Sequence, residues 1–124
     1  IVGYAARGIE LAIPGSIGFR NFLHFEDAAL IMSRAHECEP EILNGCNPHG
    51  NSYQEIATKA FEIFNCIDKL KINDHKQKFR EVFPPSEKSI FELLNIEPRM
   101  SLEAWLIQIR DLKSGLNFGP IDVD

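Results

Sequence analysis

The sequence is poor in the features that mark secreted, membrane-spanning and nucleic-acid-coating proteins. Its 124 residues include three cysteines, an odd number that does not suit a framework of paired disulfides, so we expect reduced thiols and a cytoplasmic location. No stretch approaches the roughly 18 apolar residues of a membrane span, and the start has no basic region before an apolar one. The net charge of −5 argues against nucleic acid or anionic membrane as partners, because phosphate binding depends on positive charge.

The motifs of several catalytic classes are also missing. The chain has no Gly-x-Ser-x-Gly elbow, which would present a nucleophilic serine. The stretch from Gly15 to Gly18 is too short for a phosphate-binding loop and lacks its lysine. Cys66 would need a histidine brought to it by the fold before it could act as a nucleophile. The sequence therefore leaves open whether the protein is an enzyme.

Apolar residues recur at helical spacing through most of the chain. A helix is predicted over residues 19–37, ended by Pro40, and a second one over residues 53–70, begun by the capping box Ser52-Tyr-Gln-Glu55. Shorter helices are predicted from residue 73 or 74 to 83, after Ser86 and after Ser101. Residues 1–18 fit a helix over 4–13 or a strand over 8–13, and we favour the helix because no convincing partner strand follows.

This pattern predicts an all-α fold. Five or six helices with short connections form a compact bundle or array, followed by an extended C-terminal tail. No composition shift or linker divides the sequence, and its length suits one ordinary domain, so residues 1–124 are predicted to form a single helical domain.

The connection between the two long predicted helices holds a group of metal-binding residue types: His36, Cys38, Cys46 and His49. Imidazole nitrogen and thiolate sulfur are the ligands that zinc prefers, and structural zinc sites take four of them. The spacing fits no standard zinc pattern, because one residue separates the first pair and seven separate the two cysteines. The alternative is a polar connection with two incidental thiols, so we expect no cofactor and keep zinc as the second interpretation.

Polar residues on the first long predicted helix permit two further interpretations. Glu26, Ser33 and Glu37 interrupt its apolar face, where a carboxylate could serve as an acid or base, but edge positions that reach water explain them better. His24 and Asp27 lie three residues apart, where a carboxylate can orient an imidazole. An ordinary solvated face with Arg20 and Arg34 explains that pair, and we prefer this interpretation.

A basic segment lies between residues 69 and 80. It holds five of the thirteen basic residues: Lys69, Lys71, Lys76, Lys78 and Arg80. The remainder of the chain is therefore markedly acidic, and the basic segment is a candidate surface for an acidic protein partner. No nucleic-acid motif or interleaved aromatic residue supports RNA binding there.

These observations favour a small intracellular protein-interaction or regulatory domain. Its partner is predicted to be another protein or a second copy of the chain, as in a homodimer. The alternative is a zinc-type metal protein or enzyme that uses the four ligand-type residues between residues 36 and 49.

Overall fold

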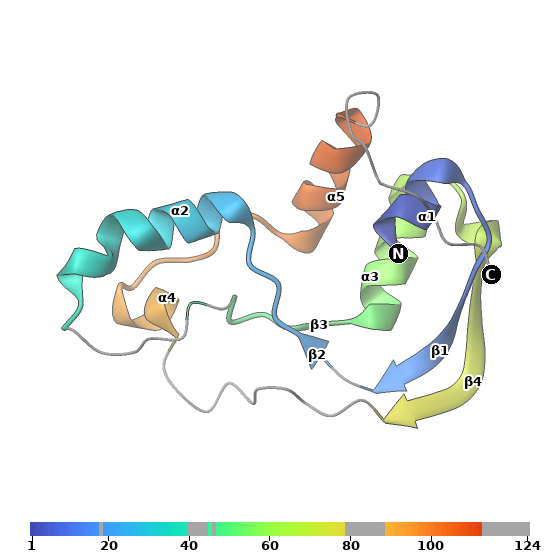
Figure 1. Cartoon of the computed structure of the whole chain (residues 1–124), viewed down its shortest axis with the longest axis horizontal. Coiled ribbons are helices and arrows are strands. Elements are labelled where there is room, and N and C mark those ends of the chain that lie inside the picture. The colour runs from blue at the N-terminus through green and yellow to red at the C-terminus, as the bar shows by residue number, and fades with distance from the viewer. Residues whose placement is uncertain (18, 40–44, 46, 79–88, 113–124) are drawn as a thin grey trace.

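Strands as well as helices make up the protein, as a computed structural model of the chain shows (Figure 1). The structure describes residues 1–17, 19–39, 45, 47–78 and 89–112. Its helices are α1 (Val2–Arg7), α2 (Phe25–Arg34), α3 (Tyr53–Ile63), α4 (Ile90–Leu93) and α5 (Leu102–Asp111), with 3₁₀ turns η1 (Ala35–Glu37) and η2 (Ile67–Lys69). Its strands are β1 (Leu11–Ile17), β2 (Phe19–Arg20), β3 (Asn51–Ser52) and β4 (Leu70–Lys78). The prediction of an all-α bundle is therefore wrong.

The sheet formed by β1 and β4 accounts for most of that error. The two strands run parallel, with Leu11 opposite Leu70 and Ile13 opposite Ile72. Their partners lie far apart in the sequence, so no local hairpin signal announces the pairing, and parallel strands need a long crossover. The predicted helix over residues 4–13 is replaced by the short helix α1 and the start of β1. The helix predicted from residue 73 or 74 is β4 as far as Lys78, and its remainder to residue 83 lies outside the described residues.

A bulge in β1 explains how the strand accommodates a proline and a glycine. The register shifts between Pro14 and Ser16, which is where a residue without an N–H donor is tolerated in a sheet. A Cβ atom on Gly15 would lie 3.2 Å from the carbonyl oxygen of Asn73, so the two strands approach closely there. Pro14 and Gly15 therefore belong to an irregular strand.

The capping box at the start of α3 is confirmed. The Ser52 side chain accepts the backbone N–H of Glu55 at 3.1 Å, and the Glu55 carboxylate accepts the backbone N–H of Ser52 at 2.7 Å. The helix ends earlier than predicted, because Asn65 takes a left-handed conformation with φ 55°. The N–H of Cys66 then bonds to the Phe61 carbonyl at 2.9 Å, which closes the helix end.

Helices α4 and α5 are also confirmed as elements, with Ser89 and Ser101 as their caps. Ser86, the cap predicted for the first of these, lies outside the described residues, as do the predicted C-terminal tail and its Gly115 cap.

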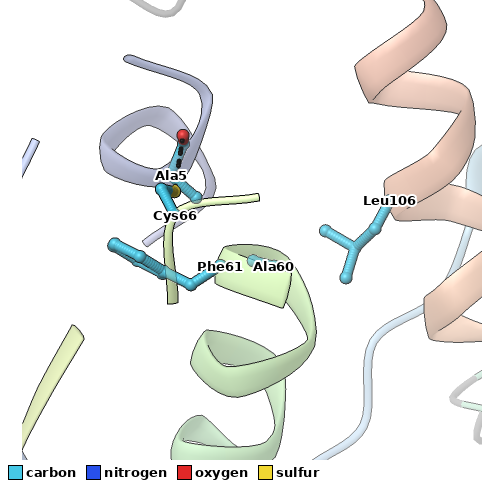
Figure 2. Packing of buried hydrophobic residues seen from close by; sticks show 5 residues of the cluster. All are labelled: Ala5, Ala60, Phe61, Cys66 and Leu106. Carbon is cyan, nitrogen blue, oxygen red and sulfur yellow. Dashed lines mark hydrogen bonds between the residues drawn. The ribbon is translucent and has the colours of Figure 1, made fainter. Parts of the chain in front are cut away.

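Among the described residues, most buried side chains belong to two separate clusters at opposite ends of the molecule. The larger cluster joins α1, α3 and α5 near the parallel sheet, as Figure 2 shows for five of its members: Ala5, Ala60, Phe61, Cys66 and Leu106. The smaller one joins α2 to α4, away from that sheet (Figure 1), through Ile31, Ile90, Phe91 and Leu94. The chain therefore wraps two small cores rather than one bundle core.

The third cysteine has a structural place in the larger cluster. The Cys66 thiol is buried and donates a hydrogen bond to the Ala5 carbonyl at 3.3 Å (Figure 2). A thiol held in this way behaves as a small apolar residue that ties α1 to the end of α3. In the described part of the chain, no helix has the length and apolar character needed to cross a membrane.

Candidate functional site

The start of α2 places a histidine in an unusual role. His24 is the N-cap of the helix, and its Nδ1 atom accepts the backbone N–H of Glu26 at 3.2 Å. A neutral imidazole that accepts at Nδ1 carries its proton on Nε2, so the ring points a donor away from the helix end. The Nε2 atom is buried and has no hydrogen-bond partner among the described residues. The ring also contacts Phe25, with 4.4 Å between the ring centroids.

One turn further, a fully buried carboxylate connects α2 to the segment before α5. Asp27 is 0% exposed. Its oxygens accept the backbone N–H groups of Arg99 at 2.7 Å and Met100 at 3.4 Å. The expectation that Asp27 lies on a solvated face with His24 is wrong, because Asp27 faces inward and the two side chains play separate structural parts. Its carboxylate fixes the loop that leads into the Ser101 cap of α5.

A hollow with a volume of about 270 Å³ lies between these elements. Its apolar wall consists of Phe22, Leu23, Phe25, Met100, Leu102 and Trp105. Its polar lining consists of His24, Asn47, Asn51 and Ser101. None of the ten side chains is a carboxylate, a lysine or an arginine, so the lining suits an uncharged, ring-shaped group.

A hydrogen bond outside the hollow helps to hold its polar side in place. The side-chain amide of Asn21 donates to the Asn47 carbonyl at 2.8 Å, which joins the segment before α2 to the loop before β3. The Asn47 side-chain oxygen in turn accepts the backbone N–H of His49 at 2.8 Å. Asn51 follows in β3, where it lies opposite Arg20 of β2. The polar wall is therefore set by the short antiparallel pair and its loop.

A second, more open depression adjoins the first and shares part of its lining. Two of its edges carry ion pairs: Lys59 with Glu103 at 3.8 Å, and His49 with Glu97 at 3.9 Å. Each basic side chain there already faces a carboxylate. This depression therefore offers no surplus positive charge that would attract a phosphate group.

Three of the four predicted metal ligands lie among the described residues, and they do not form a metal site there. His36 is exposed in η1, and Cys38 follows it, packed against the smaller core. His49 is exposed near Glu97, and Cys46 lies outside the described residues. Among the residues that are described, no three His, Cys, Asp or Glu side chains are close enough to hold a metal ion. The four-ligand arrangement and the absence of a cofactor stay predictions.

The predicted basic surface is described only at its beginning. Lys69 lies in η2 beside Asp68 at 3.6 Å, and Lys71 of β4 pairs with Glu10 at 2.7 Å. Lys76 and Lys78 belong to β4, and Arg80 lies outside the described residues. Binding of an acidic partner there remains untested.

An exposed ion pair follows α2. The Glu37 carboxylate accepts hydrogen bonds from the Arg34 guanidinium at 2.8 and 2.6 Å. These bonds lower the pKa of Glu37 and raise that of Arg34. Glu37 therefore serves the helix end. Glu26 and Ser33 are exposed, and the Ser33 hydroxyl donates to the Leu30 carbonyl at 2.8 Å.

The arrangement around the hollow is suited to binding. Aromatic and apolar side chains provide packing surface, and His24, Asn47, Asn51 and Ser101 provide hydrogen-bonding groups. The Nδ1 atom of His24 is occupied by the helix cap, which leaves Nε2 as the ring nitrogen that could bond to a ligand.

Sequence reasoning missed this site because the predicted first helix began at residue 19. The true helix starts at Phe25, so Phe22 and Leu23 belong to the extended segment before it. The sequence did contain a signal for the true helix start. His24 comes shortly before Glu26 and Asp27, and acidic residues favour the first turn of a helix.

Comparison with known proteins bears on the fold. The sequence matches no protein-family model and no curated protein. Its structure is similar to that of UDP-N-acetylglucosamine 4-epimerase from Bacillus cereus, with a TM-score of 0.71 and 21% sequence identity. The match covers 96% of this chain and 40% of that enzyme, so the chain spans less than half of the enzyme's length.

This likeness corrects the functional prediction. The predictions of a small helical interaction or regulatory domain, and of a zinc-type metal protein as the alternative, are therefore not supported. The chain instead has an α/β fold similar to that of a segment of an epimerase, with β1 and β4 in a parallel sheet. In the larger cluster, the amphipathic helices pack beside Leu11 of β1 and Leu70 of β4.

Proposed function

We propose that this chain is the part of a nucleotide-sugar-modifying enzyme that holds the uncharged portion of its substrate. The observation that carries the proposal is the structural match, which extends over 96% of the chain to an enzyme whose name specifies UDP-N-acetylglucosamine. A likeness confined to one of the two cores would cover a smaller share of the chain than this match does. The proposed activity belongs to the epimerase class, and it requires residues beyond this segment because the match covers 40% of the enzyme.

The hollow beside α2 supports the proposal through its size and lining. Its volume of about 270 Å³ is close to the lower end of typical ligand sites, near 300 Å³, which is enough for one ring rather than a whole nucleotide sugar. Phe22 and Trp105 offer aromatic surface against which a base or the apolar face of a sugar can pack. Asn51 and Ser101 offer groups that hydrogen-bond to carbonyl, amide or hydroxyl groups.

The diphosphate of such a ligand would need a different surface. The lining of the hollow has no carboxylate, lysine or arginine, and the basic side chains described beside it, Lys59 and His49, already face carboxylates. The proposal therefore places a neutral ring in the hollow and the phosphates outside it. In this proposal residues 1–124 act as one domain of a cytoplasmic enzyme, which suits the reduced thiol of Cys38.

Calorimetric titration with UDP-N-acetylglucosamine tests the proposal. Phe22 is 44% exposed and lies outside both cores, so Phe22→Ala removes ligand contact with little effect on folding. Stacking on an aromatic ring contributes about 1–3 kcal/mol, so we expect the dissociation constant to rise roughly 5- to 150-fold.

A matched control is Ile67→Ala. Ile67 is 47% exposed in η2 and does not line the hollow, so its removal also deletes an exposed apolar side chain. We expect this variant to bind as the unmodified protein does. Equal affinity in the Phe22 and Ile67 variants, or no binding of the sugar nucleotide by the unmodified protein, would reject the proposed function.

A further inference from the structure

Helix α2 exposes its apolar side, and its buried side carries a carboxylate as well as an apolar residue. Ile31 is buried against the smaller core, and the fully buried Asp27 lies on the same side of the helix. On the other side, Phe25, Ala29 and Met32 follow one another at steps of four and three residues, which places them in one row. We call this row the outer stripe. Phe25 is 68% exposed and Met32 is 79% exposed.

An amphipathic helix at the surface of a domain normally turns its apolar side to the core and its polar side to water. In α2 the apolar side is the exposed one, and the fully buried Asp27 lies on the opposite side. Single exposed apolar side chains are common, but three in a row on one helix mark a contact surface.

The likeness to the epimerase indicates what covers the outer stripe. More than half of that enzyme's chain has no counterpart in this one, although nearly all of this chain matches it. We infer that the outer stripe of α2 is the surface on which the remaining part of an epimerase-like enzyme packs. The outer stripe adjoins the hollow, because Phe25 belongs to both. This position agrees with the inference, because ligand sites are common where two parts of an enzyme meet.

This inference extends the proposed function, since it names where the rest of the enzyme lies. It is tested by photo-cross-linking in the product of the complete native gene, without any nucleotide sugar, so its failure and that of the ligand proposal are distinguishable. Met32→benzoylphenylalanine places the cross-linker on the outer stripe at a well-exposed position. Glu62→benzoylphenylalanine, at an exposed position on α3, is the matched control.

The inference predicts that the cross-linker at position 32 joins α2 to a peptide of the same enzyme outside residues 1–124, with at least a tenfold higher yield than at position 62. Cross-links from position 32 to a second copy of residues 1–124 would overturn it in favour of a homodimer. A failure to cross-link, an equal yield at the control position, or a gene product with no further residues would also overturn it.

A measurement that needs no substitution also tests whether the outer stripe is covered. Peroxide converts exposed methionine to its sulfoxide, and burial slows that reaction. Met32 of the native gene product should oxidise at least tenfold more slowly than in denaturant, although it is 79% exposed in this chain alone. Oxidation of folded and denatured protein at the same rate would contradict the inference.

Discussion

The buried carboxylate of Asp27 gives the sharpest test of the packing around the hollow. It accepts the backbone N–H groups of Arg99 at 2.7 Å and Met100 at 3.4 Å, and it is fully buried. Asp27→Asn keeps the shape of the side chain and one acceptor oxygen. It replaces the other oxygen with an NH₂ group, which cannot accept a hydrogen bond from the N–H of Arg99 or Met100.

The expected loss of stability follows from the kind of bond removed. A hydrogen bond to a charged group contributes about 1.5–3 kcal/mol, and a buried donor left without a partner costs about 1–3 kcal/mol. Because the amide oxygen of the substituted side chain could still accept the shorter bond, we expect Asp27→Asn to lower the free energy of unfolding by roughly 1–3 kcal/mol. With an m-value of about 1–3 kcal/mol per molar urea, the unfolding midpoint should fall by about 1 M.

Urea unfolding followed by the fluorescence of Trp105 measures this change, because Trp105 lies on α5, directly after the loop that Asp27 holds. Glu26→Gln is the matched control, since Glu26 is the exposed neighbour in the same helical turn and should alter stability by no more than about 0.5 kcal/mol. If Asp27→Asn left the free energy of unfolding within about 0.3 kcal/mol of that of the unmodified protein, the proposed role of Asp27 would be wrong.

Three further substitutions test other parts of the structure. Ser52→Ala should lower stability by about 1 kcal/mol in thermal unfolding, because it removes the side-chain cap of α3, whereas Ser52→Asn should retain most of it. Arg34→Gln should bring the lowered pKa of Glu37 back toward its ordinary value in an NMR titration. The ion pair is fully formed above the ordinary carboxyl pKa, and it is lost as the pH falls through the lowered pKa of Glu37. An unchanged pKa of Glu37 in the variant would contradict this role of Arg34. Cys66→Ala should cost about 1–2 kcal/mol, because it empties a buried position and removes the bond to the Ala5 carbonyl, and a neutral result would refute a structural role for the thiol.

Local signals in the sequence were sufficient where a helix is defined by its own residues. The capping box at Ser52 and the serine cap at position 101 each precede an apolar row, and both helices begin where they were expected. Their first turns are fixed by side-chain to backbone bonds that span three residues, so the signal and the structure lie in the same short segment.

The sheet and the hollow depended on contacts that no local signal shows. Ile13 and Ile72 meet only when β1 and β4 are brought together by the fold, and β4 is too polar to stand out as a strand. The hollow collects side chains from the segment before α2, the loop before β3 and the start of α5. Asp27 was assigned to water because its buried partners are backbone N–H groups, which the sequence does not reveal.

Helix α2 shows a different error. The sequence pattern placed Asp27 on a solvated face, and the structure shows it fully buried, while Phe25 and Met32 of the outer stripe are exposed in this chain. If the outer stripe is covered in the complete enzyme, both sides of the helix are interior.

The most direct test of the proposed function uses the one tryptophan in the sequence. Trp105 lines the hollow, and its indole N–H gives a single, readily identified NMR signal. Titration of the protein with UDP-N-acetylglucosamine is predicted to move this signal in a saturable way, together with the backbone signals of Asn51 and Ser101. An indole signal that stays in place at saturating sugar nucleotide, or changes confined to residues away from the hollow, would contradict the proposal.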